Sequence, residues 1–253
     1  MTRLLIEVET EPVATLGRRL GFATPFERPA NPYRKPLPEW KMEEDDAPIL
    51  RYLYRERRPC RHLEFGTWRG SGVVACLESC AATVWTLNLP EGEVGPDGRW
   101  AYAENWSRSI PLPPGARTSP LDEDRHTVRT DSGGFVGREY LSRGLGHRVC
   151  QILCDSRDWD ITNYPPGFFD SCLIDGGHTR GVVQNDLGKA LTLLRPGGLL
   201  MLHDFCPVDE VYSACPSTVG VLAAVHREMP TLRRNLSDLF WIDPSWLLIG
   251  VRR

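Results

Sequence analysis

The chain has 253 residues, which suffices for one large α/β domain or for one domain with an appended arm. Its 30 basic and 33 acidic side chains give a formal net charge of −3, so charge provides no reason to expect nucleic acid or a membrane surface as a partner. No apolar run approaches the roughly 20 residues of a membrane span. The first residues are too acidic, and their apolar core too short, for a signal peptide.

The eight cysteines include no C-x-x-C pair, and most lie within apolar strand or helix patterns. This distribution favours small buried side chains in a reducing environment rather than disulfides or a zinc site. We therefore expect a cytoplasmic protein.

Residues 1–42 are rich in proline and are predicted to form an N-terminal arm before a domain at 43–253. A strand over residues 4–8 and a short helix over 13–20 are expected within the arm. Proline restricts residues 29–38 to extended or turn conformations. The arm would cross the core or a partner subunit, which makes a homodimer plausible, whereas a loosely ordered tail is the alternative.

A helix is predicted to open at the acidic run 43–46 and to end near Pro59, because acidic side chains suit the first turn of a helix. A strand over residues 61–65 follows, then a turn with Gly66, Gly70 and Gly72, and a helix from Val73. Strand, glycine turn and helix N-terminus form a binding corner, where the backbone approaches a ligand closely. The spacing Glu64-x-Gly66-x-x-x-Gly70 differs from the dinucleotide fingerprint G-x-G-x-x-G.

A second strand is predicted over residues 83–89. In a doubly wound sheet, a polar side chain at the end of this strand receives ribose hydroxyls. Asn88 and Glu91 are both candidates, and the sequence does not choose between them.

Residues 90–134 interrupt the alternation of strands and helices with prolines, glycines and three aromatic residues, Trp100, Tyr102 and Trp106. A connection of this length is usually a functional lid or a disordered insertion. The aromatic residues favour a lid over the substrate.

Alternation then resumes, with strands predicted at 148–154, 170–175 and 199–202, helices at 179–194 and 219–229, and closing strands at 239–242 and 246–251. Asp175 and His178 follow one of these strands, and His203 and Asp204 follow the next. Because the carboxyl ends of neighbouring parallel strands meet, these four side chains are expected to converge. Two acids and two imidazoles suit either a divalent cation or a general-base system.

Taken together, the glycine turn, Asp175-Gly-Gly-His178, Leu194-Arg-Pro-Gly-Gly198 and His203-Asp-Phe205 resemble class I S-adenosylmethionine (SAM)-dependent methyltransferases over about residues 45–251. Within that class the chain is similar to antibiotic and sugar O-methyltransferases and to the cephalosporin-hydroxylase-like group. The resemblance implies a doubly wound, Rossmann-like α/β fold. Its sheet would be seven-stranded and mostly parallel, and one of the seven strands would be an antiparallel closing strand.

The resemblance also implies site residues. The cofactor would contact the turn, the ends of the following strands and the first acid of the cluster: Glu64, Gly66, Thr67, Gly70, Asn88, Asp155, Ser156 and Asp175. Asp155 would reach the adenine amine; a turn cap is its alternative role. Asp175 and Asp204 would be metal ligands, with His203 where relatives have an acid. Since Mg²⁺ prefers oxygen ligands, this histidine leaves metal dependence open.

The resemblance implies methyl transfer from SAM to a hydroxyl, or less favourably an amine, of a small polar metabolite or natural product. His178 matches a general base, and Asp175 would orient it or hold a metal; helix capping and a structural role are their alternatives. A SAM-binding accessory protein that does not methylate is the second hypothesis. An NAD-dependent oxidoreductase is disfavoured because the dinucleotide fingerprint is missing.

Overall fold

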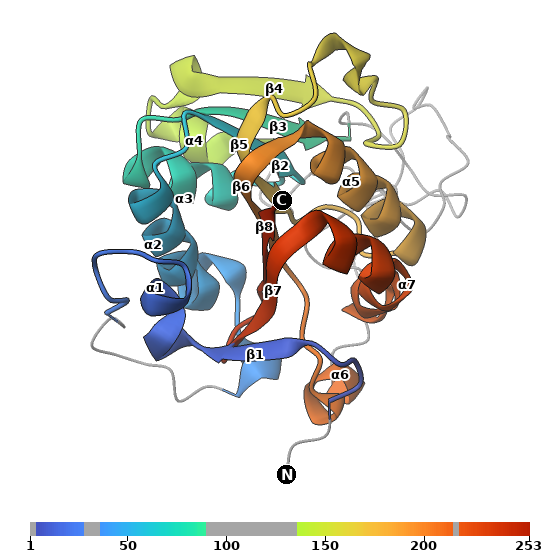
Figure 1. The fold of residues 1–253 in the computed structure, drawn as a ribbon. Helices are drawn as coiled ribbons and strands as arrows, with labels where there is room; N and C mark the ends of the chain where they lie inside the picture. Colours follow the sequence, from blue (N-terminus) through green and yellow to red (C-terminus); the bar gives the residue numbers. More distant parts are fainter. Residues whose placement is uncertain (1–3, 28–35, 90–135, 215–217) are drawn as a thin grey trace, which may run out of the picture.

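The computed structural model describes residues 4–27, 36–89, 136–214 and 218–253 (Figure 1). The predicted lid insertion, its three aromatic residues and Glu91 lie outside the described residues.

An eight-stranded sheet has the order β1-β7-β8-β6-β5-β2-β3-β4, and every neighbouring pair is parallel except those of β8. The strands are β1 (Glu9–Pro12), β2 (Arg61–Phe65), β3 (Thr83–Asn88), β4 (Val149–Leu153), β5 (Phe169–Ile174), β6 (Leu194–Leu202), β7 (Leu236–Asp243) and β8 (Leu248–Arg252). The predicted fold, a mostly parallel sheet with an antiparallel closing strand, is confirmed.

The additional strand comes from the predicted N-terminal arm. β1 pairs in parallel with β7, so this part of the segment belongs to the sheet. The strand was expected at residues 4–8 but lies at Glu9–Pro12. Ile6 and Val8 are instead buried in the core, and Leu4 makes a single bridge with Val208. Residues 4–8 therefore pack against the core without pairing along a strand, and pairing with β7 begins at Glu9.

Helices cover both faces of the sheet (Figure 1). They are α1 (Leu16–Arg19), α2 (Ala47–Arg57), α3 (Ser71–Ser79), α4 (Arg138–Ser142), α5 (Arg180–Leu193), α6 (Asp209–Ala214) and α7 (Val219–Asn235). None of the helices in the described part of the chain is long and apolar enough to cross a membrane.

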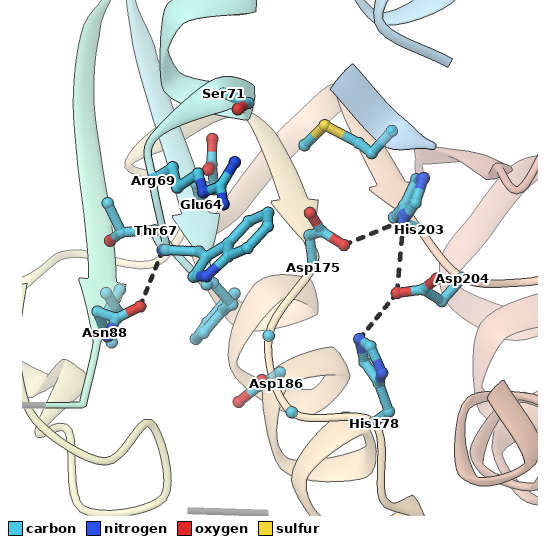
Figure 2. Close-up of a pocket in the computed structure, with 18 of the residues that line it drawn as sticks. Glu64, Thr67, Arg69, Ser71, Asn88, Asp175, His178, Asp186, His203 and Asp204 are labelled. Atoms are coloured by element: carbon cyan, nitrogen blue, oxygen red, sulfur yellow. Dashed lines mark hydrogen bonds and ion pairs between the residues drawn. The ribbon is translucent and has the colours of Figure 1, made fainter. Parts of the chain in front are cut away.

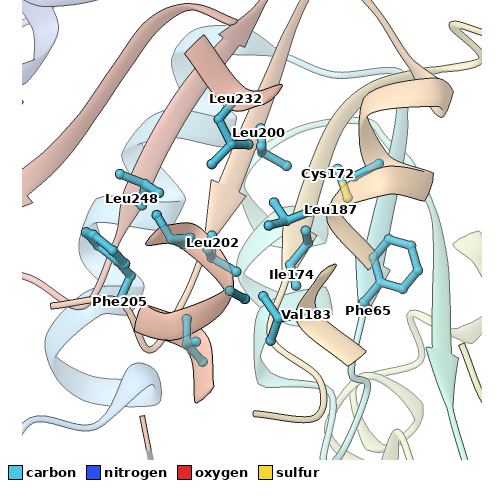
Figure 3. Close-up of a cluster of buried hydrophobic side chains, with 14 of the residues drawn as sticks. Phe65, Cys172, Ile174, Val183, Leu187, Leu200, Leu202, Phe205, Leu232 and Leu248 are labelled. Atoms are coloured by element: carbon cyan, nitrogen blue, oxygen red, sulfur yellow. The ribbon is translucent and has the colours of Figure 1, made fainter. Parts of the chain in front are cut away.

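The two faces of the sheet bury two hydrophobic clusters. Leu200 and Leu202 pack with α5 and α7 (Figure 3), whereas Leu199 and Met201 face the cluster that includes α2 and α3. A central strand buried on both faces must be apolar throughout, which explains the uninterrupted run at 199–202.

Two helices differ from their predicted bounds. Residues Met42–Asp46 form a π-helical turn, and the α-helix begins only at Ala47, with proline in its first turn. α7 was expected to end at Met229 but continues through Pro230 to Asn235. Leu232 lies beyond the proline and is fully buried, so packing sustains the helix past the residue that would otherwise stop it.

Gly66 lies where the ends of β2 and β5 meet. Its φ is +97°, and a Cβ atom there would overlap the carbonyl oxygen of Asp175. The Asp175 N–H donates to the Phe65 carbonyl at 2.8 Å. The missing side chain therefore lets the glycine turn and the Asp175 loop touch through their backbones.

We predict that Gly66→Ala lowers stability far more than Gly144→Ala. Gly144 also has positive φ (+70°) but no atom within 4 Å of an added Cβ, so its substitution should cost only the left-handed strain of about 1–2 kcal/mol. Gly66→Ala adds overlap with backbone. Denaturant unfolding of both variants checks this, and equal losses would contradict the close approach.

Candidate active site

A cleft of about 1200 Å³ lies at the carboxyl ends of the parallel strands (Figure 2). The structure brings almost all of the predicted site residues to its wall: Glu64, Gly66, Thr67, Asn88, Asp155, Ser156, Asp175, His178, His203 and Asp204. This is the crevice where open α/β sheets bind ligands. Gly70 is not among the lining residues.

Gly70 instead packs against the helix that follows the insertion. Its φ is +92°, and a Cβ there would come within 2.8 Å of the Tyr140 ring. The Trp68 carbonyl accepts the Gly137 N–H at 2.8 Å, and the Arg69 carbonyl accepts that of Glu139 at 2.9 Å. The glycine turn is thus held from outside by α4.

Thr67 and Asn88 hold the turn from inside. The Thr67 hydroxyl is 2.7 Å from that of Thr86 and accepts a hydrogen bond from Gln151 at 2.9 Å. Asn88 Oδ1 accepts the Trp68 N–H at 2.9 Å (Figure 2), and its amide nitrogen donates to the Leu89 carbonyl. Both side chains are already engaged with protein groups, so their direct effect is to fix the shape of the turn.

Glu64 is a buried carboxylate at the floor of the cleft. Only 1% of its side chain is exposed, and neither oxygen makes a well-aligned hydrogen bond, although the Val73 N–H faces the carboxylate. Burial, with the nearby charge of Asp175, raises the pKa of Glu64 well above its ordinary value. A Cβ on Gly72 would lie 2.8 Å from both oxygens, so this glycine keeps the first turn of α3 open above the carboxylate.

Asp155 and Ser156 form the wall after β4. The Asp155 carboxylate accepts from the guanidinium of Arg157, with Nη2 at 2.9 Å, and from its backbone N–H. Ser156 bonds to Asp186, a buried acid of α5 that sequence analysis missed. Burial raises the pKa of Asp186 to about 6 although the Ser156 hydroxyl opposes the shift. Asp186 lies in the middle of a helical pattern, where nothing in the sequence indicates that an acid faces the cleft.

Acids and histidines alternate across the ends of β5 and β6 (Figure 2). Asp204 Oδ2 lies 2.8 Å from His178 Nε2 and 3.4 Å from His203 Nδ1. The same Nδ1 atom is 3.0 Å from Asp175 Oδ1. The four side chains therefore converge as the strand order predicts.

Asp204 has a left-handed backbone, with φ +57°. This conformation is uncommon outside glycine and occurs at sites whose surroundings enforce it.

The cluster is strongly polarised. Burial opposes the charge of His178, but the Asp204 carboxylate outweighs it and raises the pKa of His178 to about 9. Asp175 and Asp204 likewise raise the pKa of His203 well above its ordinary value against the effect of burial. Burial would raise the pKa of Asp204, yet the two imidazoles hold it well below its usual range. At neutral pH the site holds ion pairs.

A fifth member comes from the N-terminal side of α2. The fully buried Asp46 carboxylate lies 3.1 Å from His203 Nε2. The sequence placed Asp46 only in an acidic run that favours a helix start, and nothing local pointed to residue 203. No sequence signal short of a contact prediction would have found it.

The geometry groups three side chains as candidate metal ligands: Asp175, His178 and Asp204, whose ligand atoms lie within 4.8 Å of one another. The predicted set had His203 in place of His178. Both nitrogens of His203 already face carboxylates, so the ring serves as their partner rather than as an available ligand. One imidazole with two carboxylates fits Mg²⁺ poorly and a transition metal better.

Comparisons with known proteins agree with this architecture. The sequence matches the family model described as a methyltransferase domain over residues 63–205, more than half of the chain. Curated protein sequences gave no match.

Solved structures share the fold. An O-methyltransferase from Bacillus cereus in complex with SAH is 16% identical with a TM-score of 0.54, covering 86% of this chain and 84% of that one. The O-methyltransferase TomG from Streptomyces achromogenes, involved in tomaymycin synthesis and solved with SAM, is 14% identical with a TM-score of 0.50, covering 95% and 87%. An O-methyltransferase family protein from Burkholderia thailandensis is 17% identical with a TM-score of 0.51, covering 83% and 57%.

We predict that the His178 ring titrates near pH 9 in chelator-treated protein and that Asp204→Asn lowers this midpoint toward the ordinary value of about 6.5. The midpoint falls in Asp204→Asn because the carboxylate that stabilises the imidazolium is lost. The stability that His178 contributes is therefore complete below about pH 6.5 and is lost as the pH rises through 9. NMR titration measures the midpoint. Asp160→Asn removes a remote surface charge as the control, and an unchanged midpoint in Asp204→Asn would refute the pairing.

Proposed function

Because the chain belongs to the methyltransferase-domain family, we propose that it transfers a methyl group from SAM to a hydroxyl, less favourably an amine, of a small polar metabolite or natural product. The observation that carries the proposal is the bond between His178 and Asp204 in the cleft that begins at the glycine turn. We take His178 as the base, beside the glycine turn proposed to bind the cofactor.

The residues proposed to hold the cofactor are Glu64, Gly66, Thr67, Gly70, Asn88, Asp155, Ser156 and Asp175. Glu64 supports this assignment most directly, because a buried carboxylate with no well-aligned hydrogen bond and no paired cation suits a cationic ligand. SAM carries an ammonium and a sulfonium group. Gly66 and Gly70 act through the shape of the turn. Asn88 is assigned to the ribose through the second lone pair of Oδ1, which already accepts the Trp68 N–H, with Glu91 as the alternative.

The cleft has room for an acceptor beside the cofactor. Its volume of about 1200 Å³ exceeds the roughly 300–1,000 Å³ typical of a site for one small ligand. Trp40, Met42 and Trp246 line the same cleft and offer it apolar surface. A small organic acceptor with one reacting hydroxyl fits this mixture of apolar and ionic walls.

When bound, SAM supplies a methyl group activated on a sulfonium, so the protein has to align the acceptor oxygen and remove its proton. In this proposal the Nε2–H of His178 donates to Asp204, 2.8 Å away, and Nδ1 takes the proton from the hydroxyl of the acceptor. A pKa of about 9 for His178 means that only a small fraction is a free base at neutral pH. A nearby sulfonium charge lowers this pKa and increases that fraction.

The metal-dependent alternative rests on the same residues. If Asp175, His178 and Asp204 hold a divalent cation, His178 is a ligand and cannot serve as the base. The donor set then favours a transition metal.

Calorimetric titration of SAM into metal-stripped protein, followed by a screen of hydroxylated metabolites with methyl-labelled SAM, tests the proposal. Binding with labelled product supports methyl transfer. Binding without product from any acceptor supports the SAM-binding accessory protein. No binding would remove the cofactor from the proposal.

We predict that His178→Ala reduces methyl transfer by about 10²-fold or more, as expected for removal of a general base, while S-adenosylhomocysteine affinity stays within about three-fold. His147→Ala is the matched control, since His147 is exposed and bonds only its local turn among the contacts described. Initial rates in the presence of chelator provide the measurement. Full activity of the alanine variant would reduce His178 to a structural residue.

For the alternative, we predict that Mn²⁺ binds metal-stripped protein at least about tenfold more tightly than Mg²⁺, because the site offers an imidazole. His178→Ala should abolish this preference. Calorimetric titration of each ion into the wild-type protein and into His178→Ala measures the preference. A metal site here would be rejected if both ions bind both proteins equally weakly and a chelator does not reduce methyl transfer.

A further inference from the structure

Asp46 is the most deeply buried acid near the cleft and has no part in the mechanism above. It ends the π-helical turn before α2, its side chain is fully buried, and His203 Nε2 lies 3.1 Å from its Oδ2 atom. The Trp246 N–H points to the same carboxylate, at 3.3 Å from Oδ2. Three segments far apart in the sequence thus meet at one carboxylate.

Local structure does not explain this orientation. Asp46 occupies the N-cap position of α2, yet its side chain makes no capping hydrogen bond. Its neighbour Asp45 serves the turn, because Asp45 Oδ2 accepts the Lys41 N–H at 2.8 Å. Burying a carboxylate is costly unless it is paired, and a well-packed apolar residue would often be as stable. The formation of α2 therefore does not explain why position 46 is an aspartate.

The pairing fixes the His203 ring. With Nε2 facing Asp46, the opposite nitrogen faces Asp175 at 3.0 Å and Asp204 at 3.4 Å. Asp204 in turn holds His178. An unbroken series of contacts thus runs from Asp46 through His203 and Asp204 to the proposed base.

We propose that Asp46 is a positioning residue of the methyl-transfer site, which holds the His203 ring so that Asp204 stays aligned with His178. This inference rests on the proposed function and adds a residue that touches neither cofactor nor acceptor. Outer partners that orient metal-ligating side chains typically change activity by about 10- to 100-fold when removed, and we expect a similar range here.

The test compares Asp46→Asn with Asp45→Asn, a substitution of the adjacent buried acid. In protein saturated with S-adenosylhomocysteine, long-range ¹H–¹⁵N NMR reports the ring nitrogens of His178 and His203. We expect Asp46→Asn to move the signals of both rings, and Asp45→Asn to leave those of His178 in place. S-adenosylhomocysteine affinity should stay within about three-fold, and methyl transfer to an acceptor from the screen should fall about 10- to 100-fold.

A double-mutant cycle keeps the proposal testable if Asp46→Asn folds poorly. His203→Asn places an amide nitrogen near the position of Nδ1 and removes the link to Asp46. In that background, Asp46→Asn should have no further effect on His178 signals or transfer. Additive effects, or unmoved His178 signals in Asp46→Asn, would overturn the positioning role. If wild-type protein transfers no methyl group, the proposed function fails, but the NMR comparison still decides whether Asp46 orients the two rings.

Discussion

The backbone contact between the ends of β2 and β5 is the constraint on which the site depends. Gly66 has no side chain, so the Asp175 N–H reaches the Phe65 carbonyl and the two loops pack without a gap. The glycine turn and the acid–histidine cluster then share one cleft. A larger residue at position 66 would separate the cofactor corner from the groups proposed to act on the acceptor.

The sheet imposes a second condition. Its central strands are buried on both faces, so their side chains are apolar and polar groups are left to the strand ends. Parallel pairing brings those ends to one edge, where Asp175, His203 and Asp204 meet. Charges placed there are partly shielded from water, and each is stabilised by an opposite charge rather than by solvent.

Sequence periodicity and motif spacing were sufficient to predict β2, β5, the 199–202 part of β6 and the convergence of Asp175, His178, His203 and Asp204, because these depend on neighbouring residues and on strand order. The start of β6 at Leu194 was not predicted. The interactions of individual side chains were not predictable in this way. Asn88 turns toward the Trp68 N–H, and Asp46 reaches a histidine 157 positions away. Such contacts arise from tertiary packing, for which a local pattern contains no information. The position of β1 was missed for the same reason, since its bounds are set by pairing with the distant strand β7.

The pairing of β1 with β7 has a consequence for the order of folding. Glu9 lies opposite Phe240, so the strand made early in synthesis finds its partner only after more than 200 further residues have been added. The hydrogen bond from the Trp246 N–H to Asp46 likewise joins residues 200 positions apart. Contacts at such sequence separation are slow to form, because the intervening chain loses entropy before they contribute. The glycine turn also depends on later residues, since Asp175 contacts it, but the Trp246 N–H that reaches Asp46 lies further along the chain still.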